Sequence, residues 1–93
     1  MGSLPNPEKG EEIYKTYCVN CHGIQGKGDG PASKMLTPTP ANFTSKKTKG
    51  KADKELLSII GNGKPKTAMP PWKNSLSKEQ RQDVLAYIRT LEK

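Results

Sequence analysis

The feature that most constrains this chain is the pentapeptide Cys-Val-Asn-Cys-His at residues 18–22, which holds the only two cysteines and the only histidine. Residues three apart on a helix face the same way, so the sulfurs of Cys18 and Cys21 can reach one edge of a flat ligand. His22 follows directly and can point its imidazole at that ligand. The spacing is typical of c-type haem attachment, in which two thiols add to the haem vinyl groups and the histidine binds iron.

Three other interpretations of these residues are weaker. A thioredoxin-like redox pair requires a βαβ setting, which the sequence does not indicate. A structural zinc site takes four ligands, whereas Cys18, Cys21 and His22 provide three. A simple disulfide leaves His22 without a role. We therefore predict one covalent haem c, with its iron bound by His22.

The chain is poor in large apolar side chains, which supports a cofactor. Leu, Ile, Val and Phe make up 15 of the 93 residues, and the formal net charge is +7. A fraction below roughly 20% with high net charge is typical of disordered chains. Helical periodicity nevertheless runs through the sequence, so we expect a bound porphyrin to complete the hydrophobic core.

Apolar periodicity predicts three main helices. The first begins near Asn6, the second covers residues 52–60, and the last opens at Ser77 with Gln80 completing a capping box. Gly10 inside the first helix indicates a close crossing with another helix. The apolar faces are made by these residues: Gly10, Ile13, Tyr14 and Tyr17; Leu56, Ile59 and Ile60; Val84, Tyr87, Ile88 and Leu91.

The remaining segments are predicted to be loops and one short helix. Residues 23–30 are interpreted as a glycine-rich loop against the haem, and residues 31–36 as a short helix. Prolines favour an extended segment at 37–40. Residues 44–51 are expected to form a surface loop, and residues 61–75 a Gly/Pro loop after the second helix ends at Gly61 and Gly63. No segment resembles a strand, so the fold class is all-α.

The second axial ligand must differ from histidine, which leaves Met, Lys, Tyr or water. Met69 lies in a loop stiffened by three prolines, which suits a weak iron–sulfur bond that the protein must enforce. Met35 lies on the short helix and is expected to fill the core. We therefore predict that Met69 is the ligand.

Over residues 6–93 the chain resembles class I cytochromes c of the small soluble bacterial type. The resemblance is carried by these residues: Gly10, Tyr14, Cys18, Cys21, His22, Gly30-Pro31-Ala32, Asn62-Gly63, Ala68-Met69-Pro70-Pro71, Val84 and Tyr87. It implies three main helices, a short helix and loops wrapped around the haem, with the terminal helices crossing near a right angle. It also implies that the Pro31 carbonyl accepts the Nδ1–H of His22.

Trp72 departs from some relatives, which have asparagine three residues after the methionine. This chain has its asparagine, Asn74, two positions later. Three roles for Trp72 stay open: a core residue, a contact at the haem edge, or a donor to a haem propionate through its ring N–H.

The resemblance implies a monohaem electron carrier with no open iron position, and no enzymatic activity. Lys27, Lys64, Lys66 and Lys73 lie beside the motifs and are expected to rim the exposed haem edge, where an acidic redox partner would dock. A haem-based ligand sensor or peroxidase-like protein with a labile Met69 is the main alternative. A domain excised from a larger redox enzyme is the second.

The other expectations concern surroundings and assembly. Residues 1–5 are interpreted as a tag or disordered start, and residues 6–93 as a single domain. No apolar run approaches the roughly 20 residues of a membrane span, and the first residues lack the features of an export signal. Because thioether formation requires exported apoprotein, we expect the protein to lie in the periplasm, with its export signal removed. We also expect it to be a monomer. The lysines follow no nucleic-acid-binding pattern.

Overall fold

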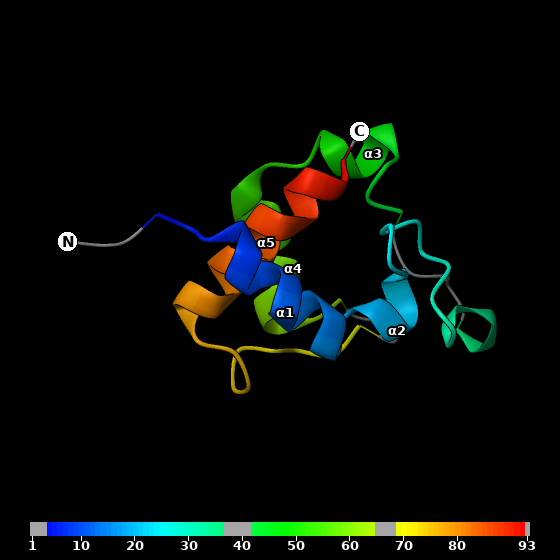
Figure 1. The fold of residues 1–93 in the computed structure, drawn as a ribbon, viewed down its shortest axis with the longest axis horizontal. Helices are drawn as coiled ribbons and strands as arrows, with labels where there is room; N and C mark the ends of the chain where they lie inside the picture. Colours follow the sequence, from blue (N-terminus) through cyan, green and yellow to red (C-terminus); the bar gives the residue numbers. More distant parts are fainter. Residues whose placement is uncertain (1–3, 37–41, 65–68, 93) are drawn as a thin grey trace.

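The computed structural model describes residues 4–36, 42–64 and 69–92, and its regular structure within these ranges is entirely helical. The helices are α1 (Pro7–Tyr17), α2 (Val19–His22), the 3₁₀ turn η1 (Ser33–Met35), α3 (Lys46–Lys49), α4 (Asp53–Asn62) and α5 (Lys78–Leu91). The all-α prediction is confirmed, and α1, α4 and α5 are the three main helices (Figure 1). Among the described residues, no helix has the length and apolar character that a bilayer crossing requires.

Helix α1 begins where the sequence predicts. The Asn6 side chain accepts hydrogen bonds from the backbone N–H groups of Glu8 and Lys9 at 2.9 and 3.2 Å, and Pro7 occupies the first turn. The backbone N–H of Asn6 also donates to Asp83 Oδ1 on α5 at 2.8 Å. The start of α1 is therefore capped locally and tied to α5.

Gly10 permits the predicted close crossing of α1 and α5. A Cβ atom at this position would collide with the backbone carbonyl of Asp83 and would lie 3.0 Å from the Cα of Val84. Only glycine lets the two helix backbones approach so closely. Gly10 is consequently buried, and α1 packs chiefly on α5.

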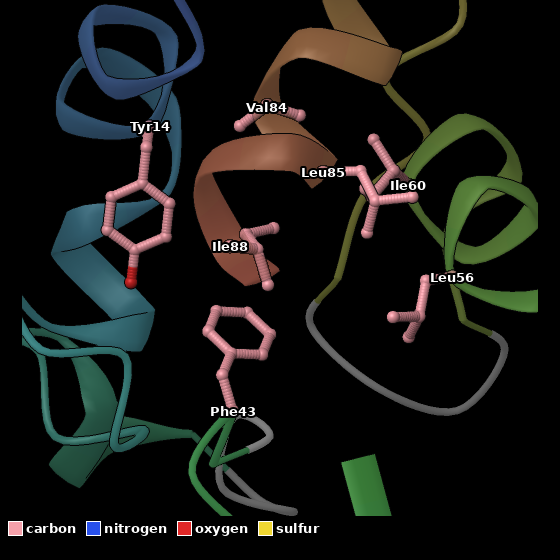
Figure 2. Packing of buried hydrophobic residues seen from close by; sticks show 7 residues of the cluster. All are labelled: Tyr14, Phe43, Leu56, Ile60, Val84, Leu85 and Ile88. Atoms are coloured by element: carbon pink, nitrogen blue, oxygen red, sulfur yellow. The ribbon is translucent and has the colours of Figure 1, made fainter. Parts of the chain in front are cut away.

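The hydrophobic core lies on both sides of α5 (Figure 2). Tyr14 of α1 packs on one side, and α4 packs on the other. Tyr14 and Val84 are almost completely buried, at 1% and 0% exposed. The buried members of this cluster are Tyr14, Phe43, Leu56, Ile60, Val84, Leu85 and Ile88. The predicted faces are confirmed at their centres, whereas Tyr17, at the end of α1, is 41% exposed.

The ends of α4 and α5 test the capping predictions. At α5 the capping box is present: Ser77 N–H donates to Gln80 Oε1 at 2.7 Å, and Gln80 N–H donates to Ser77 Oγ at 3.1 Å. Helix α4 extends further than predicted, since Gly61 lies inside it and Gly63 alone ends it with a φ of 74°.

The structure corrects two other predictions. Residues 44–51 are not wholly a loop, because Ser45 caps the short helix α3 by accepting the Thr48 N–H at 3.3 Å, and Thr48 is buried. Met35 lies on the predicted short helix, here the 3₁₀ turn η1, but it is 88% exposed and does not fill the core. The extended segment predicted at 37–40 lies outside the described residues.

Candidate haem-binding site

The two cysteines and the histidine lie on a single helical turn. Cys18 is the N-cap of α2, and Cys21 and His22 form its last residues. The N–H of His22 donates to the Cys18 carbonyl at 2.9 Å, which holds this turn closed. Both thiols are half-buried and unbridged. The sequence prediction that these three residues act together is therefore consistent with their shared turn.

The surroundings of Cys18 favour a neutral sulfur. Burial, with a smaller contribution from Cys21, raises the pKa of Cys18 from 9.0 to about 12. Burial disfavours a charged thiolate because the low-dielectric interior cannot solvate it. A thioether carries no charge, so the same burial does not oppose the sulfur in its attached form.

The glycine-rich loop at 23–30 folds back onto α2. Its N–H groups donate to α2 carbonyls: Gly28 to His22 at 2.8 Å and Gly30 to Cys21 at 3.0 Å. Gly30 lies so close that a Cβ atom there would collide with the backbone of Val19 and Asn20. The loop is thus pressed against the turn that carries the cysteines.

The segment after this loop continues along α2. The N–H of Ala32 donates to the Asn20 carbonyl at 2.8 Å. Pro31 therefore lies between two residues, Gly30 and Ala32, that are each hydrogen-bonded to α2.

Two aromatic residues contact His22 and the residue that follows it. The Phe43 ring stacks on the His22 imidazole, with centroids 4.6 Å apart and an interplanar angle of 23°. The Tyr14 hydroxyl donates to the Gly23 carbonyl at 2.6 Å, and burial raises the pKa of Tyr14 well above its usual value. Sequence reasoning did not assign Phe43 to the site. Its isolation, as the only phenylalanine of the chain in a polar segment, was the available signal.

Met69 lies in the loop that follows α4. It is half-buried and packs against the hydrophobic core. Its carbonyl accepts the Lys64 N–H at 3.3 Å. Further along the loop, Trp72 N–H donates to the Ile60 carbonyl at 3.1 Å and Lys73 N–H donates to Gly61 at 3.0 Å. Backbone hydrogen bonds therefore hold Met69 to Lys64 and hold the residues after it to the end of α4.

Trp72 links this loop to the start of the cysteine motif. Its ring contacts that of Tyr17, with centroids 5.1 Å apart and an interplanar angle of 57°. Tyr17 immediately precedes Cys18. Trp72 also packs against the core cluster, so the structure supports a packing role for it.

The residues present fit a covalent haem. Cys18 and Met69 come from separate segments, yet both pack against the same hydrophobic cluster. The donor set is the one haem c requires: two unbridged thiols, one imidazole and one thioether. These groups would hold the haem by two thioether bonds and bind its iron through nitrogen and sulfur.

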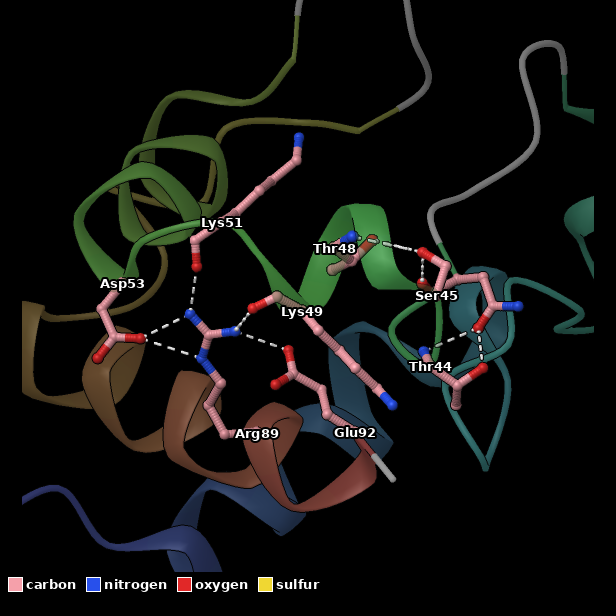
Figure 3. Close-up of polar contacts among 9 residues, drawn as sticks. Thr44, Ser45, Thr48, Lys49, Lys51, Asp53, Arg89 and Glu92 are labelled. Carbon is pink, nitrogen blue, oxygen red and sulfur yellow. Dashed lines mark hydrogen bonds and ion pairs between the residues drawn. The ribbon is translucent and has the colours of Figure 1, made fainter.

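Arg89 holds the lysine-rich segment that precedes α4, residues 46–51, in place (Figure 3). Its guanidinium binds Asp53 Oδ1 through Nε at 3.0 Å and Nη2 at 2.8 Å, and Glu92 Oε1 through Nη1 at 2.7 Å. It also donates to the carbonyls of Lys51 at 2.7 Å and Lys49 at 3.5 Å. Burial lowers the pKa of Arg89, but these carboxylate hydrogen bonds outweigh burial and raise it overall. Arg89 thus joins α3 and α4 to α5.

The predicted lysine rim is only partly described. Lys27, Lys64 and Lys73 are exposed, and Lys66 lies outside the described residues. An open hollow on α4 is lined by Lys51, Ala52, Lys54, Glu55, Ser58, Ile59 and Lys64. It contains none of the predicted haem-binding residues.

Comparison with known proteins defines the class as c-type cytochromes. The family described as cytochrome c oxidase, cbb3-type, subunit III matches residues 5–88, and the chain belongs to this family. Cytochrome c-554(547) of Halothiobacillus neapolitanus is 33% identical over 89 residues, covering 88% of this chain and 92% of that protein. As a member of this cytochrome c family, the chain binds covalent haem c and its iron, and functions in electron transport.

Other relatives are much longer than this chain. One of the subunits of nicotinate dehydrogenase from Pseudomonas putida is 30% identical over 86 residues, covering 86% of this chain but 7% of that protein. A chain of the reducing HAO-like protein complex of Kuenenia stuttgartiensis superposes with a TM-score of 0.83 and 31% identity, covering 97% of this chain and 44% of that chain. The same domain therefore occurs alone and as part of larger proteins.

Proposed function

We propose that the protein is a monohaem electron carrier in which Cys18 and Cys21 attach the haem and His22 and Met69 are the two axial ligands. The observation that carries this proposal is the packing of Cys18 and Met69 against one hydrophobic cluster, although 51 positions separate them in the sequence. Bound haem supplies an iron that accepts and releases single electrons. With both axial positions filled by the chain, electron transfer would proceed through the haem edge without substrate binding.

The chain's residues would hold His22 and Met69 in different ways. We infer that the Pro31 carbonyl accepts the His22 Nδ1–H, because Gly30 and Ala32 on either side of Pro31 are hydrogen-bonded to α2. Such a bond fixes the tautomer and leaves Nε2 for the metal. Met69 is held by the backbone of its loop, and its thioether favours a relatively high redox potential.

The test of the ligand assignment compares two methionines. In haem-loaded protein, Met69→Ala should abolish the sulfur–iron charge-transfer band and let the reduced form bind CO. Met35→Ala is the matched control, because Met35 is 88% exposed, and it should leave both properties unchanged. Loss of the band in Met35→Ala would show that Met69 is not the ligand. Full CO binding by the parent protein would instead support a ligand sensor or peroxidase-like role.

We further propose that the electron-transfer partner presents an acidic surface. Lys27 and Lys73 are exposed, and each lies close in sequence to residues of the proposed haem site. Attraction between such charges raises association rates and is screened by salt, since the Debye length is about 10 Å at 0.1 M ionic strength.

The docking proposal predicts a location-dependent charge effect. With an acidic redox protein as partner, Lys27→Gln combined with Lys73→Gln should slow bimolecular electron transfer and flatten its dependence on salt. Lys9→Gln makes the same type of charge change at the start of α1 and should have less effect per charge removed. Equal effects per charge at all three positions would indicate that only net charge matters.

We propose that the protein is a monomer and that it lies in the periplasm. The periplasmic location is supported by the cytochrome relatives and by haem attachment, which takes place on exported apoprotein. A second candidate is a domain of a larger redox enzyme. It is favoured by the match to nicotinate dehydrogenase, in which the matched region makes up only 7% of the longer protein. The intact mass of the native protein distinguishes the two.

A further inference from the structure

Phe43 makes a specific contact with the proposed iron ligand. Its ring and the His22 imidazole lie 4.6 Å apart between centroids and within 23° of parallel. Phe43 comes from the segment before α3, whereas His22 ends α2. The contact therefore joins two parts of the chain that the haem-attachment motif alone does not bring together.

A stacked ring restrains one motion of the imidazole in particular. Both nitrogens of imidazole bind their partners in the plane of the ring, so a neighbour on the ring face does not compete with the metal or with a carbonyl. It does oppose rotation of the imidazole about the metal–nitrogen bond, because rotation would drive the imidazole into the neighbouring ring. Phe43 is thus placed to set the direction of the imidazole plane.

Phe43 is itself firmly held. It is 7% exposed, and its N–H donates to the Gly26 carbonyl at 2.6 Å. Gly26 has a φ of 75°, and a Cβ atom there would lie 2.8 Å from Phe43 Cδ2. The Tyr14 ring meets Phe43 at an angle of 61° with centroids 6.3 Å apart. The glycine-rich loop at 23–30 and helix α1 therefore both hold the Phe43 ring in place.

Tyr14 supplies a second restraint on the same ligand. Its hydroxyl donates to the carbonyl of Gly23, the residue directly after His22, at 2.6 Å. Figure 2 shows Tyr14 along one side of the core, with its hydroxyl directed away from Val84 and toward the end of the core where Phe43 lies. One aromatic residue thus faces the imidazole and the other fixes the backbone that carries it.

We propose that Phe43 is a positioning residue that sets the orientation of the His22 imidazole plane, with Tyr14 supporting it through Gly23. This inference rests on the proposed ligation of iron by His22. Its consequence is electronic, since the direction of the imidazole plane relative to the porphyrin contributes, together with the methionine ligand, to how unpaired spin is distributed among the four haem methyl groups in the ferric state.

The test is proton NMR and electron paramagnetic resonance of the ferric, haem-loaded protein. Phe43→Leu keeps an apolar side chain but removes the ring, and it should redistribute the four haem methyl shifts and change the g anisotropy. Phe43→Tyr keeps the ring and should retain the parent pattern. Tyr14→Phe keeps its ring packing, loses the bond to Gly23 and should produce a smaller change of the shifts. It also provides the test if Phe43→Leu does not fold.

Val84→Ala separates positioning from general packing. Val84 is 0% exposed and lies at the opposite end of the cluster from Phe43 (Figure 2). This variant should lower the melting temperature and leave the methyl shifts unchanged. The proposal is wrong if Phe43→Leu and Tyr14→Phe both keep the parent shifts, or if Val84→Ala alters them as strongly. Failure of the proposed ligation by His22 and Met69 would be visible separately, as a parent spectrum without histidine–methionine low-spin features.

Discussion

The two sides of the proposed haem site are built differently. The histidine side comes from one stretch, residues 18–30, in which the loop is hydrogen-bonded to α2 and Gly30 touches its backbone. The methionine side is a loop after α4, held by backbone hydrogen bonds to the end of that helix and by the contact of Trp72 with Tyr17. One side is packed backbone against backbone, with Gly23, Gly26 and Gly30 buried. On the other side, Met69 and Trp72 are half-buried, and the two prolines between them are exposed.

This difference has a consequence for the two ligands. Exposed segments open locally at lower free energy than closely packed ones. We therefore expect the loop of Met69 to open more readily than the turn of His22. A thioether is also the weaker of the two donors, so exogenous ligands should displace Met69 first.

Gly30→Ala is expected to have the largest effect on stability, because it adds an atom to the closely packed histidine side. The added Cβ would overlap the backbone of Val19 and Asn20, which cannot move without distorting the cysteine turn. Overpacking of this kind costs about 1–3 kcal/mol, which corresponds to a loss of roughly 5–20 °C in melting temperature for a domain of this size. Thermal unfolding of the haem-loaded protein measures it.

Gly61→Ala is the matched control for that substitution. Gly61 lies inside α4, and among the described residues the atoms nearest to a Cβ atom there belong to the Arg81 side chain, at an ordinary distance of 3.7 Å. Because alanine favours helix, the change should stabilise the protein by about 0.4–1 kcal/mol. A large loss of stability in Gly61→Ala, or none in Gly30→Ala, would contradict the contrast between the two positions.

The sequence predicts the parts of the site that neighbouring residues build, but not the contacts between distant segments. The turn of Cys18 and His22 was predictable because neighbouring residues build it, and the capping box at Ser77 because its signal is local. The stacking of Phe43 on His22 was not, since it joins segments that no short pattern connects. The core role expected for Met35 was wrong for a related reason: an apolar residue type does not show whether its short segment packs on anything.

The contact between Tyr17 and Trp72 is the feature of the methionine side that can be tested directly. This contact connects the loop of Met69 to the end of α1, next to Cys18. Such pairs contribute about 0.5–1.5 kcal/mol beyond the area they bury. If the contact keeps the loop closed, its removal should make Met69 easier to displace.

Trp72→Ala should therefore raise the affinity of the ferric protein for imidazole, by roughly 2- to 10-fold if the interaction energy of aromatic pairs applies. Tyr17→Ala removes the same ring pair from the other side and should produce a similar increase. The double variant decides the mechanism, because one interaction cannot be removed twice, and its affinity should stay well below the product of the two single effects. Imidazole titration followed by absorption measures all three variants. Independent, multiplying effects would show that the two rings act separately and that the loop is held closed by its bonds to α4 alone.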